Sequence, residues 1–268
     1  MIDSQSTLKP VVVMDKSYAQ SAKPGELLDL ANNYIVVVTS SFYFESFQKL
    51  DESRKKVFAG FPEFRRVPSS KLYRHELETL TPAQSIEADP LYVNPDIVSG
   101  KRRLTQDEQQ CIDDFEKNVV RPGIEFWKAV ILHGVPGFRT SDIQTTTSNF
   151  NGFLQLLKRL HDTSCVRQVA TELNIPHANL IDNDWYTFRF LQATLLHGLT
   201  LKYLSSHPDW RCPDEEELEH DVHDIDYLSV GLHARCFACN ESTANYKKLG
   251  WRFKFLCPEG LLLQTGNP

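Results

Sequence analysis

Acidic residues follow apolar segments at separate points in this chain. Asp15 directly follows the apolar run PVVVM at residues 10–14. Asn240 and Glu241 follow the segment CFAC at residues 236–239. Carboxylates held close together raise one another's pKa unless a cation neutralises them. Mg²⁺ and Mn²⁺ are the divalent ions that carboxylate oxygens and water suit best. A convergent set of such acids therefore indicates a metal centre.

Two strands with a helix between them are predicted near the N-terminus. The run at residues 10–14 is short, β-branched and apolar on both faces, which is typical of a buried parallel strand. Residues 24–32 begin with Pro and carry apolar residues at helical spacing, and residues 35–38 form a second β-branched run. Polar residues then cap a helix that carries Glu45 within its first two turns. Because parallel strands end at the same sheet edge, Asp15 and Glu45 are expected to lie near each other.

The C-terminal part supplies two further acids. The acidic run at residues 213–221 leads to Asp226, where a helix is expected to begin before the strand at residues 236–239. The segment RFKFL at residues 252–256 is expected to form the last strand. Asp224 competes with Asp226 as the third acid, and the register of Asp226 with the apolar residues after it favours Asp226. Each acid alone is commonly only a helix cap or a turn residue, so the matching order of all four carries the hypothesis.

These segments resemble a known family, the PIN domains, which are metal-dependent nucleases. VVVMDKS and VVVTSSFYFESF are similar to the family's first two strands and Glu-bearing helix, and HDIDYLSVGLHARCFACNE is similar to its Asp-led helix and acid-ended strand. Two features depart from the family: its usual fourth acid is Asp, and its middle is far shorter than residues 52–215 here. The resemblance implies Mg²⁺ or Mn²⁺ held by Asp15, Glu45, Asp226 and Glu241, with Asp224 as the competing ligand and Ser17 and Asn240 orienting ligands or water.

The resemblance also implies a fold and an activity. The fold would be a three-layer α/β/α PIN-like domain with a central, mostly parallel sheet, spanning residues 1–268 as a single domain. Its sheet would come from about residues 8–51 and 215–260, with an irregular and helical insertion at about 52–214. The activity would be that of an endonuclease that hydrolyses phosphodiester bonds, in RNA ahead of DNA. A toxin or defence role with an inhibitor or partner subunit, or a homo-oligomer, would suit the family.

The composition of the chain limits the class of protein and the kinds of partner that we expect. The chain has 268 residues, of which 41% are hydrophobic and 24% charged, as in globular proteins that dissolve in water. No apolar stretch approaches the roughly 18 to 20 residues that span a bilayer, and MIDSQSTLKP lacks the features of a signal peptide, so we expect a cytoplasmic protein without a membrane partner. A formal charge of −6 excludes a generally basic surface, so contact with nucleic acid must be focal. Arg65, Arg66, Arg102 and Arg103 are the candidates for that contact.

Other features of the sequence bear on functions other than that of a nuclease. A PIN-like module that binds nucleic acid or acts as a scaffold without chemistry would fit the Glu at position 241. The segment VRQVATELNIPHANL at residues 166–180 resembles a helix-turn-helix and would suit a DNA-binding regulator, although PHANLIDND carries no Lys or Arg. A haloacid-type phosphatase would need an acid where Ser17 stands.

The cysteines favour packing over metal binding. Cys236 and Cys239 form a C-x-x-C motif that could hold zinc. Alternation along a strand sends positions i and i+3 to opposite faces, which prevents easy chelation. We therefore predict buried thiols at both positions and reduced cysteines throughout.

Overall fold

The chain folds around a six-stranded sheet in the order β4-β3-β2-β1-β5-β6. All neighbouring strands are parallel except β3 and β4, which are antiparallel. This computed structural model describes residues 9–48, 64–83, 91–93, 105–139, 141, 143 and 149–266. The strands are β1 Val11–Met14, β2 Ile35–Thr39, β3 Phe64–Val67, β4 Leu91–Val93, β5 Cys236–Ala238 and β6 Leu261–Leu263. The predicted α/β fold class with a mostly parallel sheet is therefore confirmed.

The centre of the sheet follows from its β-branched runs. Val12 and Val13 of β1 pair with Val36 and Val37 of β2, and all four side chains are buried. Phe237 of β5 pairs with Val13 on the other side of β1. Strands that are apolar on both faces must be covered on both faces, which requires helices on each side of the sheet.

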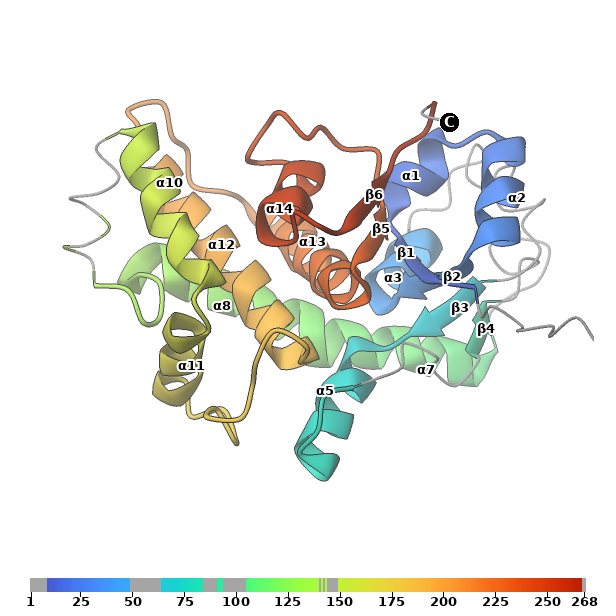
Figure 1. The fold of residues 1–268 in the computed structure, drawn as a ribbon, viewed down its shortest axis with the longest axis horizontal. Helices are drawn as coiled ribbons and strands as arrows, with labels where there is room; N and C mark the ends of the chain where they lie inside the picture. The colour runs from blue at the N-terminus through green and yellow to red at the C-terminus, as the bar shows by residue number, and fades with distance from the viewer. Residues whose placement is uncertain are drawn as a thin grey trace, which may run out of the picture.

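Helices cover the sheet on both sides. From β1 the chain adds β2 and β3 in one direction and β5 and β6 in the other, so right-handed crossovers put the helix between β1 and β2 and the helix between β5 and β6 on opposite faces. Figure 1 shows α1 and α2 (blue) on one side of the strands and α13 and α14 (orange and red) on the other. The helices of these two groups are α1 Lys16–Ser21, α2 Pro24–Asn33, α13 Glu215–Ala234 and α14 Leu249–Leu256, and α3 Ser40–Gln48 packs against α13.

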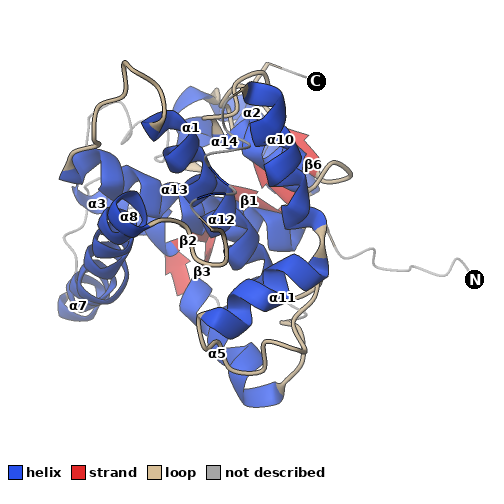
Figure 2. Ribbon diagram, turned by 90° about the vertical axis from the view of Figure 1, so that its left-hand side faces the viewer, coloured by secondary structure: helices blue, strands red, loops and turns tan. Residues whose placement is uncertain are grey.

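A group of helices extends outward from α13. α12 packs along α13, and Figure 1 shows α10, α11 and α12 on the opposite side of α13 from α1 and α2, while Figures 1 and 2 both show α7 and α8 lying end to end. The buried carboxylate of Glu76 ties α5 to this group, because it accepts hydrogen bonds from the backbone N–H groups of Tyr186 and Thr187 at the start of α12. The bounds are α5 Ser69–Thr79, α7 Gln106–Phe115, α8 Arg121–His133, α10 Phe150–Lys158, α11 Thr163–Glu172 and α12 Tyr186–Ser205, with a π-helical turn at Glu116–Val120 and a 3-10 turn at Arg159–His161.

The structure corrects several expected boundaries. The helix expected to begin at Asp226 begins at Glu215, because Asp214 and Glu217 form a reciprocal capping box. Residues 252–256 lie in α14, and the last strand is instead β6. The sheet also extends beyond the two terminal segments, since β3 and β4 come from the stretch that was expected to be an insertion.

The alternative motifs have clear structural outcomes. After α11, residues 176–184 of the supposed recognition segment form turns and no helix, so the helix-turn-helix interpretation is wrong. Cys236 and Cys239 are buried free thiols, as predicted. Burial raises the pKa of Cys236 to about 12, which leaves its thiol protonated at neutral pH. In the described part of the chain, no helix is both long and apolar enough to cross a membrane.

Candidate functional site

The acids predicted from the sequence lie around the carboxyl end of β1. The order of the strands reverses at β1, because β2 and β5 flank it and the chain leads away from it in both directions. Open α/β sheets bind ligands in the crevice beyond the strand ends at such a reversal. Asp15 follows β1 at this point, and its backbone N–H donates to the carbonyl oxygen of Ala238 at the end of β5.

Asp15 is a buried carboxylate that begins a helix. Its Oδ1 accepts a hydrogen bond of 2.8 Å from the backbone N–H of Tyr18, so it caps α1. The hydroxyl of Ser17 lies 2.9 Å from both carboxylate oxygens and donates to them. Burial raises the pKa of Asp15 to about 7, and the charge of Glu241 adds to that rise, against the hydrogen bonds that lower it. The site therefore holds an acid whose charge lacks full compensation.

Ser17 joins the ends of β1 and β5. Its hydroxyl accepts a hydrogen bond of 3.0 Å from the backbone N–H of Asn240 while it donates to Asp15. The Oδ1 of Asn240 accepts from the backbone N–H and the hydroxyl of Thr265, at 3.3 and 2.8 Å. Ser17 thus orients Asp15 directly, whereas Asn240 connects the strand end to the C-terminal segment.

Glu45 lies in α3 with its carboxylate turned to two donors. Lys16 Nζ donates to Oε1 at 2.6 Å, and the hydroxyl of Tyr227 donates to Oε2 at 2.7 Å. Burial alone would raise the pKa of Glu45, but the charges of His223 and Lys16 and these two hydrogen bonds outweigh it, so the pKa is lowered. Glu45 is therefore ionised and paired.

Glu241 lies in the loop after β5, and its side chain reaches the start of α14. Its Oε2 accepts a hydrogen bond of 2.8 Å from the backbone N–H of Leu249, and Lys248 Nζ lies 3.3 Å from Oε1. The backbones also approach closely here, because a Cβ at Gly250 would lie 2.3 Å from the carbonyl oxygen of Glu241. Only glycine at position 250 lets the loop carry Glu241 against the start of α14.

The two competing acids of α13 face different surroundings. The carboxylate of Asp226 is buried and accepts a hydrogen bond of 3.0 Å from the backbone N–H of Ser41 at the start of α3. Burial raises the pKa of Asp224 well above its usual range; Arg252 opposes this rise, while the charges of Glu241, Asp221 and Glu45 increase it. Two residues along a helix are turned by about 200°. Asp224 therefore points to a different side of α13 from Asp226, which caps α3.

Asp15, Glu45, Glu241 and the competing acid Asp224 form a connected electrostatic group. Glu241 acts on both Asp15 and Asp224, and Glu45 acts on Asp224. Within the residues that the structure describes, however, no three His, Cys, Asp or Glu side chains are arranged to hold a metal ion together. Glu45 and Glu241 are instead turned to Lys16 and Lys248. The oxygen donors and the mutual repulsion around Asp224 fit a hard cation, whereas the side-chain conformations of the two glutamates must change to reach one.

Several residues of the site gave no pattern in the sequence. The sequence indicated Lys16 only because it directly follows Asp15. The places of Lys248 and Arg252 depend on contacts that form only in the folded chain. Arg252 is buried, and its Nε and Nη1 have no hydrogen-bond partner within the described part of the chain. Its charge lowers the pKa of Asp224, the acid that competes with Asp226 for the third position.

The arginines expected to bind nucleic acid have mixed outcomes. Arg66 on β3 donates to the hydroxyl of Ser40 at 3.3 Å, and its guanidinium lies over the ring of Tyr43 at 4.8 Å. Arg66 thus reaches the start of α3, near the acids, and Arg65 is its neighbour on β3. Arg102 and Arg103 lie outside the described residues.

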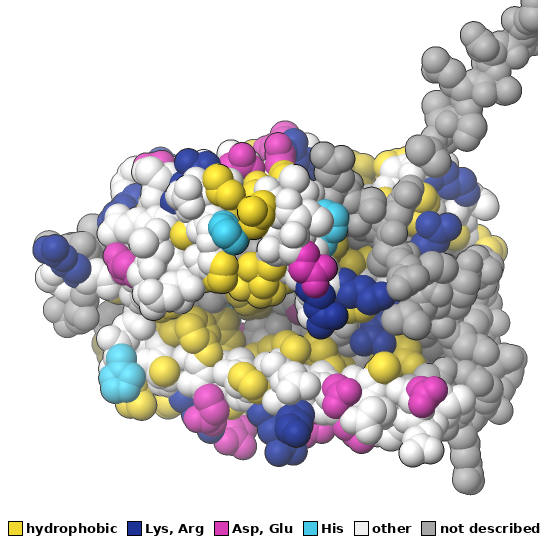
Figure 3. All heavy atoms as spheres, turned by 90° about the horizontal axis from the view of Figure 1, so that it is seen from below, with side chains coloured by type: hydrophobic (Ala, Val, Ile, Leu, Met, Phe, Trp, Pro, Cys, Tyr) yellow, Lys and Arg dark blue, Asp and Glu magenta, His cyan; other side chains and the backbone are white. Residues whose placement is uncertain are grey.

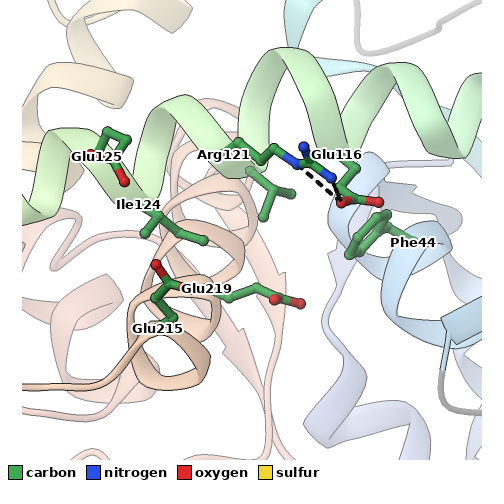
Figure 4. Close-up of a pocket in the computed structure, with 8 residues that line it drawn as sticks. Phe44, Glu116, Arg121, Ile124, Glu125, Glu215 and Glu219 are labelled. Carbon is green, nitrogen blue, oxygen red and sulfur yellow. Dashed lines mark hydrogen bonds and ion pairs between the residues drawn. The ribbon is translucent and has the colours of Figure 1, made fainter.

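A separate acidic pocket of about 530 Å³ lies between α8 and the start of α13. Figure 4 shows Glu215 and Glu219 reaching from α13 toward α8, and Arg121 paired with Glu116 at 2.8 Å. None of the acids predicted from the sequence lines this pocket. It is therefore distinct from the group around Asp15.

Comparison of this chain with protein-family models, with curated proteins and with solved structures gives no match.

Proposed function

We propose that this protein is a metal-dependent PIN-like nuclease that hydrolyses phosphodiester bonds, with RNA as its substrate ahead of DNA. One observation carries the proposal, namely that the fold brings acids together from separate parts of the chain. Lys16, next to Asp15, binds Glu45, and Ser17 joins Asp15 to Asn240, the neighbour of Glu241. The charges of Glu241 and Glu45 both act on Asp224. A fold that only needed stability would gain nothing from grouping these charges. Their grouping is a reason to expect a ligand of opposite charge.

A divalent cation would relieve the repulsion among these carboxylates. Asp15 and Asp224 both have raised pKa values because burial and neighbouring acids disfavour their charged forms. Mg²⁺ and Mn²⁺ need only one or two protein carboxylates and complete their coordination with water and phosphate oxygens. When bound, such an ion supplies charge neutralisation and activated water for phosphodiester hydrolysis.

The protein's own residues would act in distinct ways. Asp15 and Asp224 would hold the ion, with Ser17 keeping the Asp15 carboxylate in a fixed orientation. Glu45 and Glu241 would join them after release from Lys16 and Lys248, and the freed lysines would then be available to phosphate oxygens. Asp226 would position α3, and through it Glu45, by capping the helix at Ser41.

The distribution of positive charge suits a focal contact with a nucleic acid. Figure 3 shows a hollow on the face seen from below, with hydrophobic side chains in its floor and Lys and Arg side chains gathered at one end. The formal charge of −6 makes any basic area local. Arg66, beside the start of α3, is placed to contact a strand that enters the acid group. An inhibitor or partner subunit that masks the site would suit a nuclease used as a toxin or in defence.

A second candidate is a PIN-like module that binds nucleic acid or serves as a scaffold without cutting. The pairing of Glu45 with Lys16 and of Glu241 with Lys248 favours it, because each lysine already neutralises an acid. The two candidates differ in chemistry and in their response to metal.

Cleavage of labelled single-stranded RNA by the full chain distinguishes them. We expect cutting in Mn²⁺ or Mg²⁺, no cutting in excess EDTA and slower cutting of DNA of the same sequence, since the chemistry requires the ion. Intact RNA in Mn²⁺ over a broad range of RNA substrates would favour the binding module. Cutting that persists in EDTA would refute the metal-dependent mechanism.

A further inference from the structure

We propose that a pocket beside the acid group binds one nucleotide of a single-stranded RNA, with its base stacked on Trp210 and a neighbouring phosphate held by Lys247. This inference rests on the proposed function, since it specifies how that site would take its substrate. The pocket has a volume of about 720 Å³, which is within the usual range for small-molecule sites.

The walls of the pocket come from three segments. The end of α12 and the connection that follows it supply His207 and Trp210, α13 supplies His220, and the segment before α14 supplies Tyr246 and Lys247. These segments are far apart in the sequence, so the pocket exists only in the folded chain. It combines aromatic and basic side chains, which are the groups that bind single-stranded nucleic acids.

The two aromatic side chains differ in their freedom. The ring of Tyr246 packs against Phe150 at 5.3 Å and Tyr203 at 6.0 Å, so it forms a fixed wall. Trp210 is half-buried, and no ring of the described part of the chain stacks on it. A half-buried indole that lines a pocket is suited to stack on a base, whatever the base's identity.

The charges of the pocket leave a lysine for phosphate. Of its three lining carboxylates, Glu217 is paired with Arg211, Asp221 Oδ2 lies 3.1 Å from His197 Nε2, and Asp209 is exposed to solvent. Lys247 is exposed, and its ammonium has no partner among the described residues. Lys247 can therefore contact a phosphate without giving up an internal contact.

The pocket adjoins the acid group directly. Lys248 lines the pocket and lies 3.3 Å from the carboxylate of Glu241. His220 also lines it, and its Nδ1 lies 4.0 Å from Glu45 Oε1. A strand with one base in the pocket would thus lead its adjacent phosphodiester toward the proposed cutting site.

Binding of fluorescently labelled single-stranded RNA to the full chain, measured by anisotropy in EDTA so that no cutting occurs, tests the pocket. Trp210→Leu is expected to weaken binding by about 5- to 100-fold, because stacking on the base is lost. Trp210→Phe keeps an aromatic face and should stay within about 3-fold of the wild type. Lys247→Gln should weaken binding and reduce its dependence on salt by about one ion, whereas the exposed Lys158→Gln, outside the pocket, should change neither.

The outcome separates this proposal from the nuclease itself. Wild-type affinity in both Trp210→Leu and Lys247→Gln, with unchanged circular dichroism, would overturn the pocket proposal even if the protein cuts RNA. Weaker binding by both variants supports the pocket even if no cutting is found, since the assay requires no chemistry. Should Trp210→Leu fail to fold, Lys247→Gln alone decides, because its side chain is exposed.

Discussion

Asp15→Asn is expected to slow RNA cleavage by on the order of 100- to 1,000-fold, which is the usual loss when one group that stabilises developing charge is removed. The variant loses the charge at the end of β1 but keeps an oxygen that can accept from the backbone N–H of Tyr18. The helix cap therefore survives, and the free energy of unfolding should change by less than about 1 kcal/mol. Single-turnover cleavage in Mn²⁺ and thermal melting measure the two effects.

Asp29→Asn is the matched control for this substitution. Asp29 is exposed on α2, so the same change of chemistry should leave both the cleavage rate and the melting temperature unchanged. Equal cleavage by Asp15→Asn and the wild type would contradict the account, because Asp15 would then have only a structural role. A large loss of stability would make the loss of activity uninformative.

Asp224→Asn should reduce cleavage by on the order of 100-fold or more, whereas Asp226→Asn should reduce it by less than about 10-fold. The charges of Glu241 and Glu45 act on Asp224, whereas Asp226 accepts a hydrogen bond from the backbone N–H of Ser41. Asp226→Asn removes the charge from a buried hydrogen bond at a helix start, so it should lower the free energy of unfolding by about 1 to 2 kcal/mol. Cleavage rates and chemical denaturation of both variants provide the comparison.

A larger loss of cleavage in Asp226→Asn than in Asp224→Asn would show that Asp226 is the third acid. It would also show that α13 is rotated about its axis in the active protein. Equal and small losses of cleavage in both variants would show that α13 contributes no acid to the site. Stability serves as the internal check, because burial disfavours the charge of Asp224, and Asp224→Asn should therefore not destabilise the protein.

The first half of the sheet was predictable because its signals are local. The apolar run ending at Asp15 and the β-branched run at residues 35–38 form β1 and β2, since such runs can only be buried between two layers. The short segment at residues 236–239 forms β5 for the same reason. Topology then brings Asp15 and Glu241 to one edge, which requires no knowledge of side-chain contacts.

Other elements were mispredicted because local patterns were ambiguous. RFKFL alternates apolar and polar residues like a strand, but Trp251 and Phe255 stack at 4.8 Å one helical turn apart in α14. The acidic run before Asp226 was expected to lead into a helix, and it is instead the first part of α13. The basic segment containing Arg65 and Arg66 gave no strand pattern, because β3 is short and its pairing with β2 is long-range.

The choice between Asp224 and Asp226 could not come from the sequence. It depends on the rotation of α13 about its axis, which is set by the packing of its buried residues on β1 and β5. The lysines that pair with Glu45 and Glu241 were equally hidden, since Lys248 reaches Glu241 only because α14 begins beside the loop. Contacts of this kind follow from tertiary packing and leave no periodic signal.

Titration of the wild-type protein with Mn²⁺, followed by the electron paramagnetic resonance of the free ion, tests the central claim most directly. We expect the wild type to remove Mn²⁺ from solution, and we expect Asp15→Asn and Asp224→Asn each to weaken this binding by at least about 10-fold, while Asp29→Asn binds as the wild type does. Binding that is unchanged in both Asp15→Asn and Asp224→Asn, or no binding by the wild type at millimolar Mn²⁺, would contradict this claim.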